Sequence, residues 1–134
     1  PNVKSFMDGV VAETKERGYT ETMFGRRRPI PELNASNFRV RQAAERQAMN
    51  APIQGLAADI FKVALVRLDA ALRERGAKSC LVLQVHDEVI LEVPPDERDE
   101  IEALTVQTMH DAAHLRVPLE VNVAFGRTWA DAKG

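Results

Sequence analysis

Apolar side chains recur at three- and four-residue intervals in three long stretches of the chain. Positions spaced in this way lie on one face of a helix, so the pattern predicts amphipathic helices. The expected helices cover residues 3–17, 54–75 and 96–113. A further helix is expected to begin at Ser36 or Asn37. It should break or kink near Asn50, because Pro52 lacks a backbone donor and collides with the preceding turn.

Alternating and continuous apolar runs predict strands at three further places. These strands are expected at residues 79–85, 88–93 and 119–125. Together with the helices they predict an α+β fold, in which an antiparallel sheet of about three strands has helices packed on one face. The other face of the sheet would be open to a ligand. Residues 19–23 fit a short strand, and a glycine with two prolines makes residues 25–31 an expected irregular basic loop.

The composition is that of an ordinary soluble domain, with 134 residues of which 45% are hydrophobic and 28% are charged. The apolar runs are too short to cross a bilayer, which predicts no membrane partner. The single cysteine, Cys80, is expected to be a buried strand residue in a reducing compartment.

The net charge of −2 argues against a wholly basic nucleic-acid binder, but the charges are unevenly distributed. Residues 15–46 hold eight Lys or Arg against four Asp or Glu, whereas residues 86–134 hold four against eleven. A basic surface that suits phosphates and a separate acidic surface can therefore coexist on this fold.

Candidate chemistry is concentrated in Gln84-Val85-His86-Asp87-Glu88, which lies between two expected strands. The bend falls on His86 and Asp87 and contains no glycine, although tight hairpins favour Asn-Gly or Asp-Gly. A carboxylate at Asp87 beside a second one at Glu88 suits a divalent cation with oxygen ligands, and such a cation can assist phosphoryl transfer. The alternative is a solvated hairpin tip, where aspartate is common.

Two further groups of polar residues suit contact with nucleic acid. Arg46, Asn50 and Gln54 recur every four residues, and their long hydrogen-bonding side chains can reach acceptors in a minor groove. The guanidinium groups of Arg26-Arg27-Arg28 match phosphate oxygens. For both groups an ordinary exposed polar face is the alternative. The acidic Asp59 is expected to be a first-turn residue that favours the helix dipole.

Read together, these motifs come in one order and at one spacing. They are Gly18-Tyr19 with Thr22, Gly25-Arg26-Arg27-Arg28, Glu45-Arg46, Asn50-Ala51-Pro52-Ile53-Gln54-Gly55 with Ala57-Ala58-Asp59, and Gln84-Val85-His86-Asp87-Glu88. The whole set resembles the carboxy-terminal part of bacterial family A DNA polymerases, over essentially the entire chain. The resemblance implies that residues 1–134 are one segment, the carboxy-terminal palm with the end of the fingers, excised from a longer polymerase.

The resemblance also implies an activity and roles for individual residues. The activity is template-directed DNA synthesis in replication and repair, with transfer of a nucleotide from a dNTP to a primer 3′-hydroxyl by two Mg²⁺ ions. Asp87 would be one of two catalytic aspartates that hold the metals, and Glu88 would support it. Contacts to the minor groove would come from Arg46, Asn50, Gln54 and His86. The implied partners are primer–template DNA, dNTPs and the remainder of the polymerase chain, in the bacterial cytoplasm at the nucleoid.

Some features leave alternatives open. A stand-alone nucleic-acid-binding module would use the same arginines without chemistry. A fragment of a single-subunit RNA polymerase is disfavoured by Glu88, since phage-type enzymes usually carry Ser there. Leu56 replaces a small polar residue usual at that position of the family. The family's other metal-binding aspartate lies upstream of Pro1, so the isolated chain is expected to be inactive.

Overall fold

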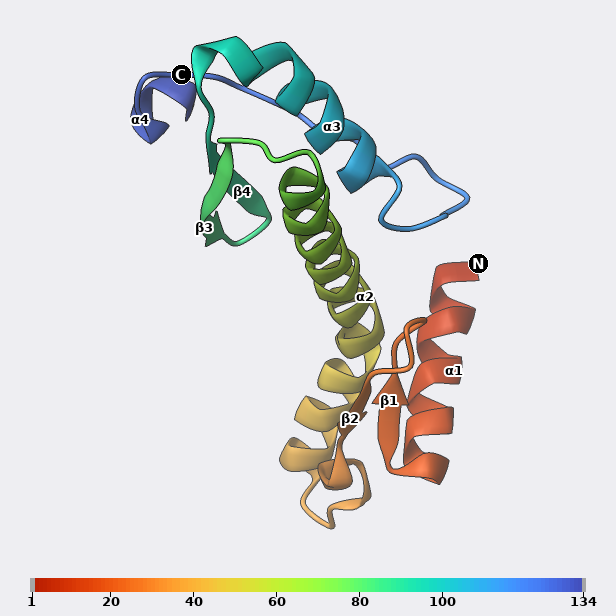
Figure 1. Cartoon of the computed structure of the whole chain (residues 1–134). Coiled ribbons are helices and arrows are strands. Elements are labelled where there is room, and N and C mark those ends of the chain that lie inside the picture. Colours follow the sequence, from red (N-terminus) through yellow and green to blue (C-terminus); the bar gives the residue numbers. More distant parts are fainter. Residues whose placement is uncertain (1, 134) are drawn as a thin grey trace. The chain divides into compact units, whose positions relative to one another are not determined.

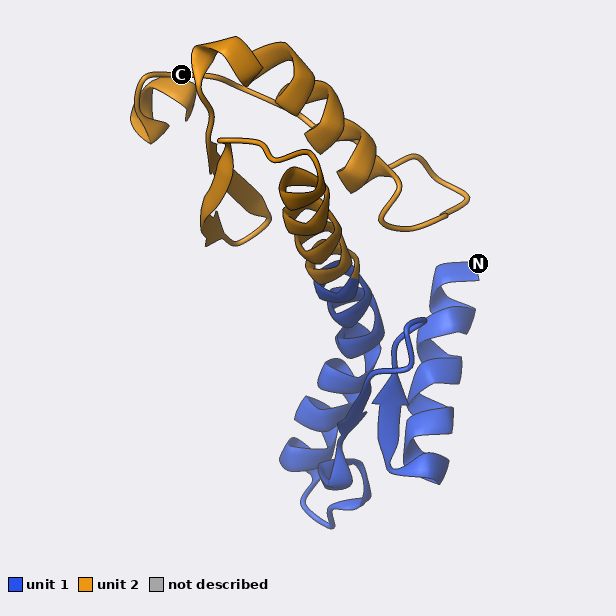
Figure 2. Cartoon of the chain, in the orientation of Figure 1, with its two compact units in different colours: residues 1–59 blue, residues 60–134 orange. Residues whose placement is uncertain are grey.

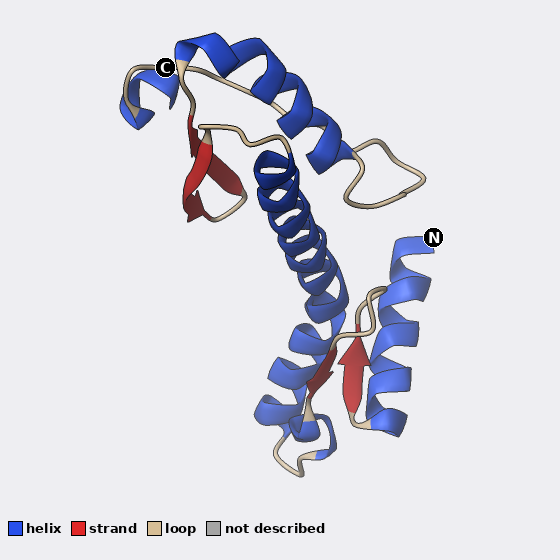
Figure 3. Cartoon of the chain, in the orientation of Figure 1, coloured by secondary structure: helices blue, strands red, loops and turns tan. Residues whose placement is uncertain are grey.

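The computed structural model describes residues 2–133, in which helices alternate with short strands (Figure 1, Figure 3). The elements are α1 (Asn2–Arg17), β1 (Tyr19–Glu21), β2 (Arg27–Pro29), η1 (Pro31–Asn34), α2 (Phe38–Glu74), β3 (Cys80–Val85), β4 (Glu88–Glu92), η2 (Pro95–Glu97), α3 (Arg98–His110) and α4 (Trp129–Lys133). The chain forms two compact units, residues 1–59 and 60–134, and α2 contributes to both (Figure 2). Among the described residues there is no helix with the length and apolar character needed to cross a membrane.

The mixture of helices with small antiparallel sheets confirms the expected α+β class. The expected single sheet of about three strands is wrong, because the described residues form two separate two-stranded sheets, β1–β2 and β3–β4.

The core of residues 1–59 joins α1, the segment around η1 and the first turns of α2. Ile30, Leu33, Ala44 and Ala48 are buried together, and Val11 packs against them. Because Ile30 directly follows β2, this core fixes one end of the β1–β2 hairpin.

The basic loop is more regular than its composition predicts. Arg27–Pro29 forms β2 and pairs antiparallel with β1, so the expectation of an irregular loop is wrong for these three residues. Proline cannot donate to a sheet ladder, but both strands of a two-stranded ribbon are edge strands, where proline is tolerated. The turn between the strands is closed by hydrogen bonds from Thr22 N to Arg26 O at 3.0 Å and from Gly25 N to Thr22 O at 2.9 Å.

Helix α2 begins where the sequence predicts, but it does not stop at Pro52. The Asn37 side chain accepts hydrogen bonds from the backbone N–H groups of Arg39 and Val40, which makes it the cap. The helix then continues through Pro52 to Glu74, so of the two expected outcomes, a break or a kink, the break is wrong. A proline inside a helix costs about 3 kcal/mol. Tertiary packing of the preceding turn, where Ala48 is fully buried, helps to offset that cost.

The core of residues 60–134 packs the end of α2 against α3 and the β3–β4 hairpin. Its centre is Leu68, Leu72 and Ile101, and partly buried hydrophobic residues surround it. Leu81 of β3 and Leu91 of β4 are opposite each other in the hairpin and both pack against this centre. The core therefore holds the hairpin near the end that is far from the turn.

Two other expectations about this unit are wrong. Residues 119–125 form no strand despite their alternating pattern, so this expectation is wrong: β3 and β4 pair only with each other, and residues 119–125 pair with no strand among the described residues. Cys80 is exposed rather than buried. Its neighbour Leu81 packs against the core, and successive side chains of a strand point to opposite faces.

Candidate functional site

The β3–β4 turn presents the motif that the sequence singled out. Val85 pairs with Glu88, so His86 and Asp87 form the two-residue connection. His86 has φ 53°, in the left-handed region, which costs a residue with a β-carbon roughly 1–2 kcal/mol. The side-chain amide of Gln84 donates to the backbone oxygen of His86 at 2.8 Å and holds the turn in this conformation. His86 therefore carries backbone strain that glycine would avoid, and the hydrogen bond from Gln84 stabilises the turn that presents the neighbouring carboxylate.

The two carboxylates at the turn have different surroundings. Asp87 is exposed and makes no ion pair with any described residue. Glu88 lies 3.3 Å from Nζ of Lys133, measured to Oε2, and the same ammonium group lies 4.9 Å from the centroid of the Trp129 ring. The end of α4 therefore places a positive charge beside Glu88, whereas the carboxylate of Asp87 remains available to an external cation.

Carboxylate oxygens are the ligands that Mg²⁺ prefers, so the chemistry of this turn fits the metal. Residues 2–133 nevertheless contain no group of three or more His, Cys, Asp or Glu side chains placed to hold a metal ion. Mg²⁺ needs near-octahedral coordination, which Asp87 and Glu88 cannot complete by themselves. The turn is suited to be part of a metal site whose other ligands come from elsewhere.

The start of β3, which carries this hairpin, is anchored by Glu97. Its carboxylate accepts hydrogen bonds from the Ser79 hydroxyl at 2.6 Å and from the backbone N–H groups of Lys78 and Ser79 at 2.9 Å each. The hydrogen bond from the Ser79 hydroxyl, followed by that from the Lys78 backbone, lowers the pKa of Glu97 below its ordinary value. Sequence reasoning did not identify this contact, because the partners are 18 and 19 residues apart and belong to no motif.

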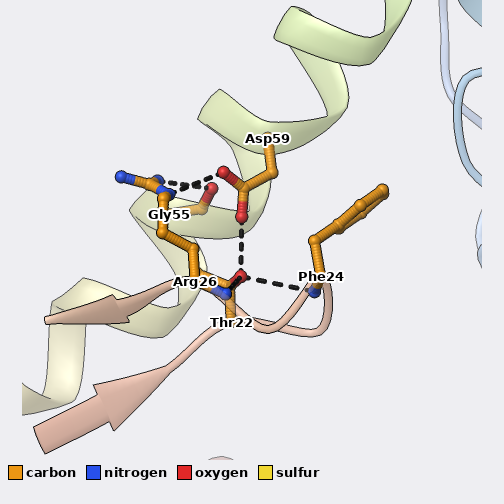
Figure 4. Close-up of polar contacts among 5 residues, drawn as sticks. All are labelled: Thr22, Phe24, Arg26, Gly55 and Asp59. Carbon is orange, nitrogen blue, oxygen red and sulfur yellow. Dashed lines mark hydrogen bonds and ion pairs between the residues drawn. The ribbon is translucent and has the colours of Figure 1, made fainter.

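In the first unit, one of the three neighbouring arginines is held by a buried carboxylate (Figure 4). Nε of Arg26 donates to Oδ1 of Asp59 at 2.7 Å, and Nη2 donates to the backbone oxygen of Gly55 at 3.1 Å. The hydroxyl of Thr22 donates to Oδ2 of Asp59 at 2.6 Å. Asp59 lies in the middle of α2 and is buried, so its interpretation as a first-turn residue is wrong.

The other two arginines differ from Arg26. Arg27 donates to Glu21 across the hairpin at 2.6 Å and lies 4.7 Å from the centroid of the Tyr19 ring. The hydrogen bond to Glu21 raises the pKa of Arg27. Arg28 is exposed and has no ion pair or hydrogen bond of its side chain with any described residue. Of the three, Arg28 has the guanidinium group that remains available to an external phosphate.

Arg46, Asn50 and Gln54 are exposed on a single continuous helix. Since they are four residues apart, they follow one face of α2. We call the β1–β2 hairpin, residues 19–29 with its three arginines, the arginine hairpin. Gln54 lines a cavity of about 180 Å³ together with this hairpin, including Arg26 and Arg28. The structure thus brings the arginine hairpin and Gln54 together in one unit, and His86, Asp87 and Glu88 together in the other. That all of them face one DNA substrate stays a prediction.

Sequence reasoning missed the structural importance of Gly55. A β-carbon at this position would lie 2.6 Å from Cγ2 of Thr22 and 3.3 Å from Nη2 of Arg26. A glycine inside a helical pattern, one turn before an acidic residue, was the available signal, since isolated glycines in helices often mark a close approach.

The sequence profile of DNA polymerase family A matches residues 1–131. The chain belongs to this family. It is 54% identical over 133 residues to DNA polymerase I of Lactococcus lactis subsp. cremoris, covering 99% of this chain and 15% of that protein. It is 52% identical over 127 residues to DNA polymerase I of Mycobacterium tuberculosis, covering 95% of this chain and 14% of that protein. The chain therefore spans about one seventh of the length of these curated relatives.

A solved structure agrees with this assignment. The POL domain of Pol1 from M. smegmatis, in complex with a DNA primer–template and dNTP, matches with a TM-score of 0.95 and 49% sequence identity. The match covers 98% of this chain and 23% of that chain. The family resemblance drawn from the motifs is confirmed.

Proposed function

We propose that this chain forms the carboxy-terminal palm and the end of the fingers of a DNA polymerase that extends a primer on a template. The observation that carries the proposal is the close match to a polymerase domain solved with primer–template and dNTP, over nearly the whole chain. The glycine-free turn that presents Asp87 supports the same function. Such an enzyme would act in DNA replication and repair, in the bacterial cytoplasm at the nucleoid.

In the proposed reaction the primer 3′-hydroxyl gives its proton to water and its oxygen bonds to the α-phosphorus of a dNTP, while the bond between that phosphorus and the bridging oxygen breaks so that pyrophosphate leaves. Mg²⁺, when bound, supplies charge neutralisation and lowers the pKa of the attacking hydroxyl. Asp87 would hold the cation at the turn, while Lys133 keeps Glu88 in a supporting position beside it. The proposed reaction also requires two Mg²⁺ ions and the second metal-binding aspartate that the family resemblance implies.

The remaining candidate residues would position the nucleic acid. Arg46, Asn50 and Gln54 would contact the minor groove near the primer terminus from α2, and His86 would do so from the turn. Donors to the degenerate minor-groove acceptors bind without reading sequence, which suits a polymerase that accepts every base pair. Arg28 would contact a backbone phosphate.

A chimeric enzyme tests the proposal. The matching 133-residue segment of the L. lactis polymerase is replaced by this chain, and primer extension is measured with dNTPs and, separately, with rNTPs. We expect extension with dNTPs only. Loss of an outer-shell partner of a metal costs about 10- to 100-fold, and loss of a direct ligand should cost more. Asp87→Ala should therefore reduce extension by more than about 100-fold, and Glu88→Ala, which removes a supporting group, by roughly tenfold.

The control variant is Glu92→Ala in β4, where the exposed carboxylate forms no ion pair with any described residue. It should leave extension unchanged. Near-normal extension by the Asp87→Ala chimera would contradict the metal assignment. A chimera that binds primer–template but never extends it would favour a binding module, and extension with rNTPs would favour an RNA polymerase.

A further inference from the structure

We propose that Arg26 and Asp59 are positioning residues, which hold the arginine hairpin against α2 so that Arg28 and Gln54 lie on the wall of one cavity. The inference rests on the proposed function, because it assigns these two wall residues to the DNA substrate. It also revises the expectation that all three neighbouring arginines bind phosphate. We call Thr22, Arg26, Gly55 and Asp59 the Asp59 cluster (Figure 4).

The hydrogen bonds of the Asp59 cluster join two segments that are far apart in sequence. Thr22 and Arg26 belong to the hairpin, whereas Gly55 and Asp59 are one turn apart on α2. Each Asp59 oxygen accepts from a different hairpin residue, at 2.6 and 2.7 Å. The Thr22 hydroxyl oxygen in turn accepts from the backbone N–H groups of Phe24 and Arg26, at 3.3 and 3.2 Å. The carboxylate therefore fixes the backbone of the turn as well as its side chains.

Burial shows which partner depends on the other. The Asp59 side chain is 9% exposed, whereas that of Arg26 is 49% exposed. A buried carboxylate without a charged partner is strongly disfavoured, while an exposed guanidinium group is easily solvated. Arg26 is therefore committed to Asp59, and a DNA phosphate would have to break this pair in order to recruit it.

The position of the cluster explains its effect on the cavity wall. Gly55, whose carbonyl accepts from Arg26, directly follows Gln54. Arg28 lies opposite Thr20 in the hairpin, two residues after Arg26. Gln54 and Arg28 both line the cavity of about 180 Å³. Releasing the cluster would free the turn of the hairpin from α2, while the core around Ile30 still holds the other end, and it would separate these two side chains without removing either.

The competing explanation is that Arg26 itself binds a phosphate and that Asp59 merely occupies it beforehand. The two explanations give opposite signs for Asp59→Asn. This substitution makes the net charge less negative and frees the guanidinium group, so direct binding predicts tighter association with DNA. The positioning role predicts weaker association, despite the favourable change in charge.

The experiment uses the 134-residue chain and a fluorescein-labelled primer–template duplex, with fluorescence anisotropy recorded at low salt. We expect Asp59→Asn and Arg26→Lys each to weaken binding by about two- to tenfold, the value of one hydrogen bond. Lysine keeps the charge but lacks the planar fork that reaches both Asp59 and the Gly55 carbonyl. The double variant should be no weaker than Asp59→Asn alone.

The matched control is Arg39→Gln, which removes an exposed positive charge that pairs with no described residue. It measures the general effect of charge on DNA binding. Tighter binding by Asp59→Asn, or wild-type binding by Arg26→Lys, would overturn the positioning role.

A second measurement separates this inference from the proposed function. NMR spectra should show that the side-chain signals of Arg28 and Gln54 shift in Asp59→Asn, and that the amide protons of Phe24 and Arg26 exchange faster than in wild type. Arg26→Lys, the milder change, is measured in parallel in case the first variant does not fold. If the wild-type chain does not bind the duplex, the DNA assignment of the wall residues loses its support. Unchanged signals and exchange rates in both folded variants would overturn the positioning role whatever the DNA result.

Discussion

Replacing Gly55 with alanine should destabilise the protein, although the same change normally stabilises a helix. Alanine is favoured over glycine in a helix interior by about 1 kcal/mol. At this site, however, the new methyl carbon would lie 2.6 Å from Cγ2 of Thr22, which cannot rotate away without losing its hydrogen bond to Asp59. Relieving the overlap by either a backbone shift or loss of that bond costs about 1–3 kcal/mol.

Gly9 provides the matched control for this prediction. It lies inside α1, and a β-carbon there would have no neighbouring atom within 4 Å. Gly9→Ala should therefore realise the full helix preference, so that the two variants differ by about 1–3 kcal/mol in the free energy of unfolding. Urea unfolding followed by far-ultraviolet circular dichroism measures both variants.

A second substitution identifies the cause. Serine at position 22 keeps the hydroxyl that donates to Asp59 but lacks the methyl group that meets the new side chain. Gly55→Ala should therefore cost much less stability when it is added to Thr22→Ser than when it is made in the wild-type chain. If Gly55→Ala stabilises the chain as much as Gly9→Ala does, the close packing described for the Asp59 cluster is incorrect.

Two other predictions concern the second unit and the whole chain. Glu97→Gln should lower stability above pH 4.5, the ordinary pKa of the carboxyl, because the folded state lowers the pKa of Glu97 and so favours its ionised form. The difference from wild type should shrink as the pH falls below that value and Glu97 becomes protonated. Unfolding curves across this range measure it, with Glu92→Gln as the control, and a difference that persists in acid would contradict the assignment. Separately, the purified chain should not extend a primer with Mg²⁺ and all four dNTPs. Asp87 and Glu88 cannot by themselves complete the octahedral coordination of Mg²⁺, and the positioning of the substrates is the dominant contribution to catalysis of phosphoryl transfer. Extension that an Asp87→Ala control abolishes would show that the chain carries a complete active site.

The sequence predicts features that depend on local chemistry and misses those that depend on distant partners. A helix cap at Ser36 or Asn37 follows from residue types, and the turn at His86 and Asp87 follows from the apolar runs on both sides of it. The continuity of α2 through Pro52 does not, because a local penalty is offset by packing that the sequence does not display. Residues 119–125 show the reverse case, because an alternating pattern suits a strand but does not determine a pairing partner, and this segment pairs with no strand among the described residues.

The same distinction applies to the candidate site. Motif order identifies Asp87 and the arginine hairpin as candidates, and the family assignment is confirmed by the sequence profile. The pairing of Arg26 with Asp59 could not be predicted, because 33 residues separate them and each has an adequate local explanation. Lys133 was also missed as the partner of Glu88, since an isolated lysine belongs to no motif.

The left-handed conformation of His86 has a consequence for laboratory evolution. Glycine would relieve the strain at this position and raise thermal stability, as it does at other sites with positive φ. It would also widen the range of conformations open to the adjacent Asp87, so that the position of its carboxylate would be less well defined. In the proposed polymerase, selection for heat resistance and selection for turnover should therefore favour different residues at position 86, and a library screened for both would reveal a trade-off between stability and activity at this one position.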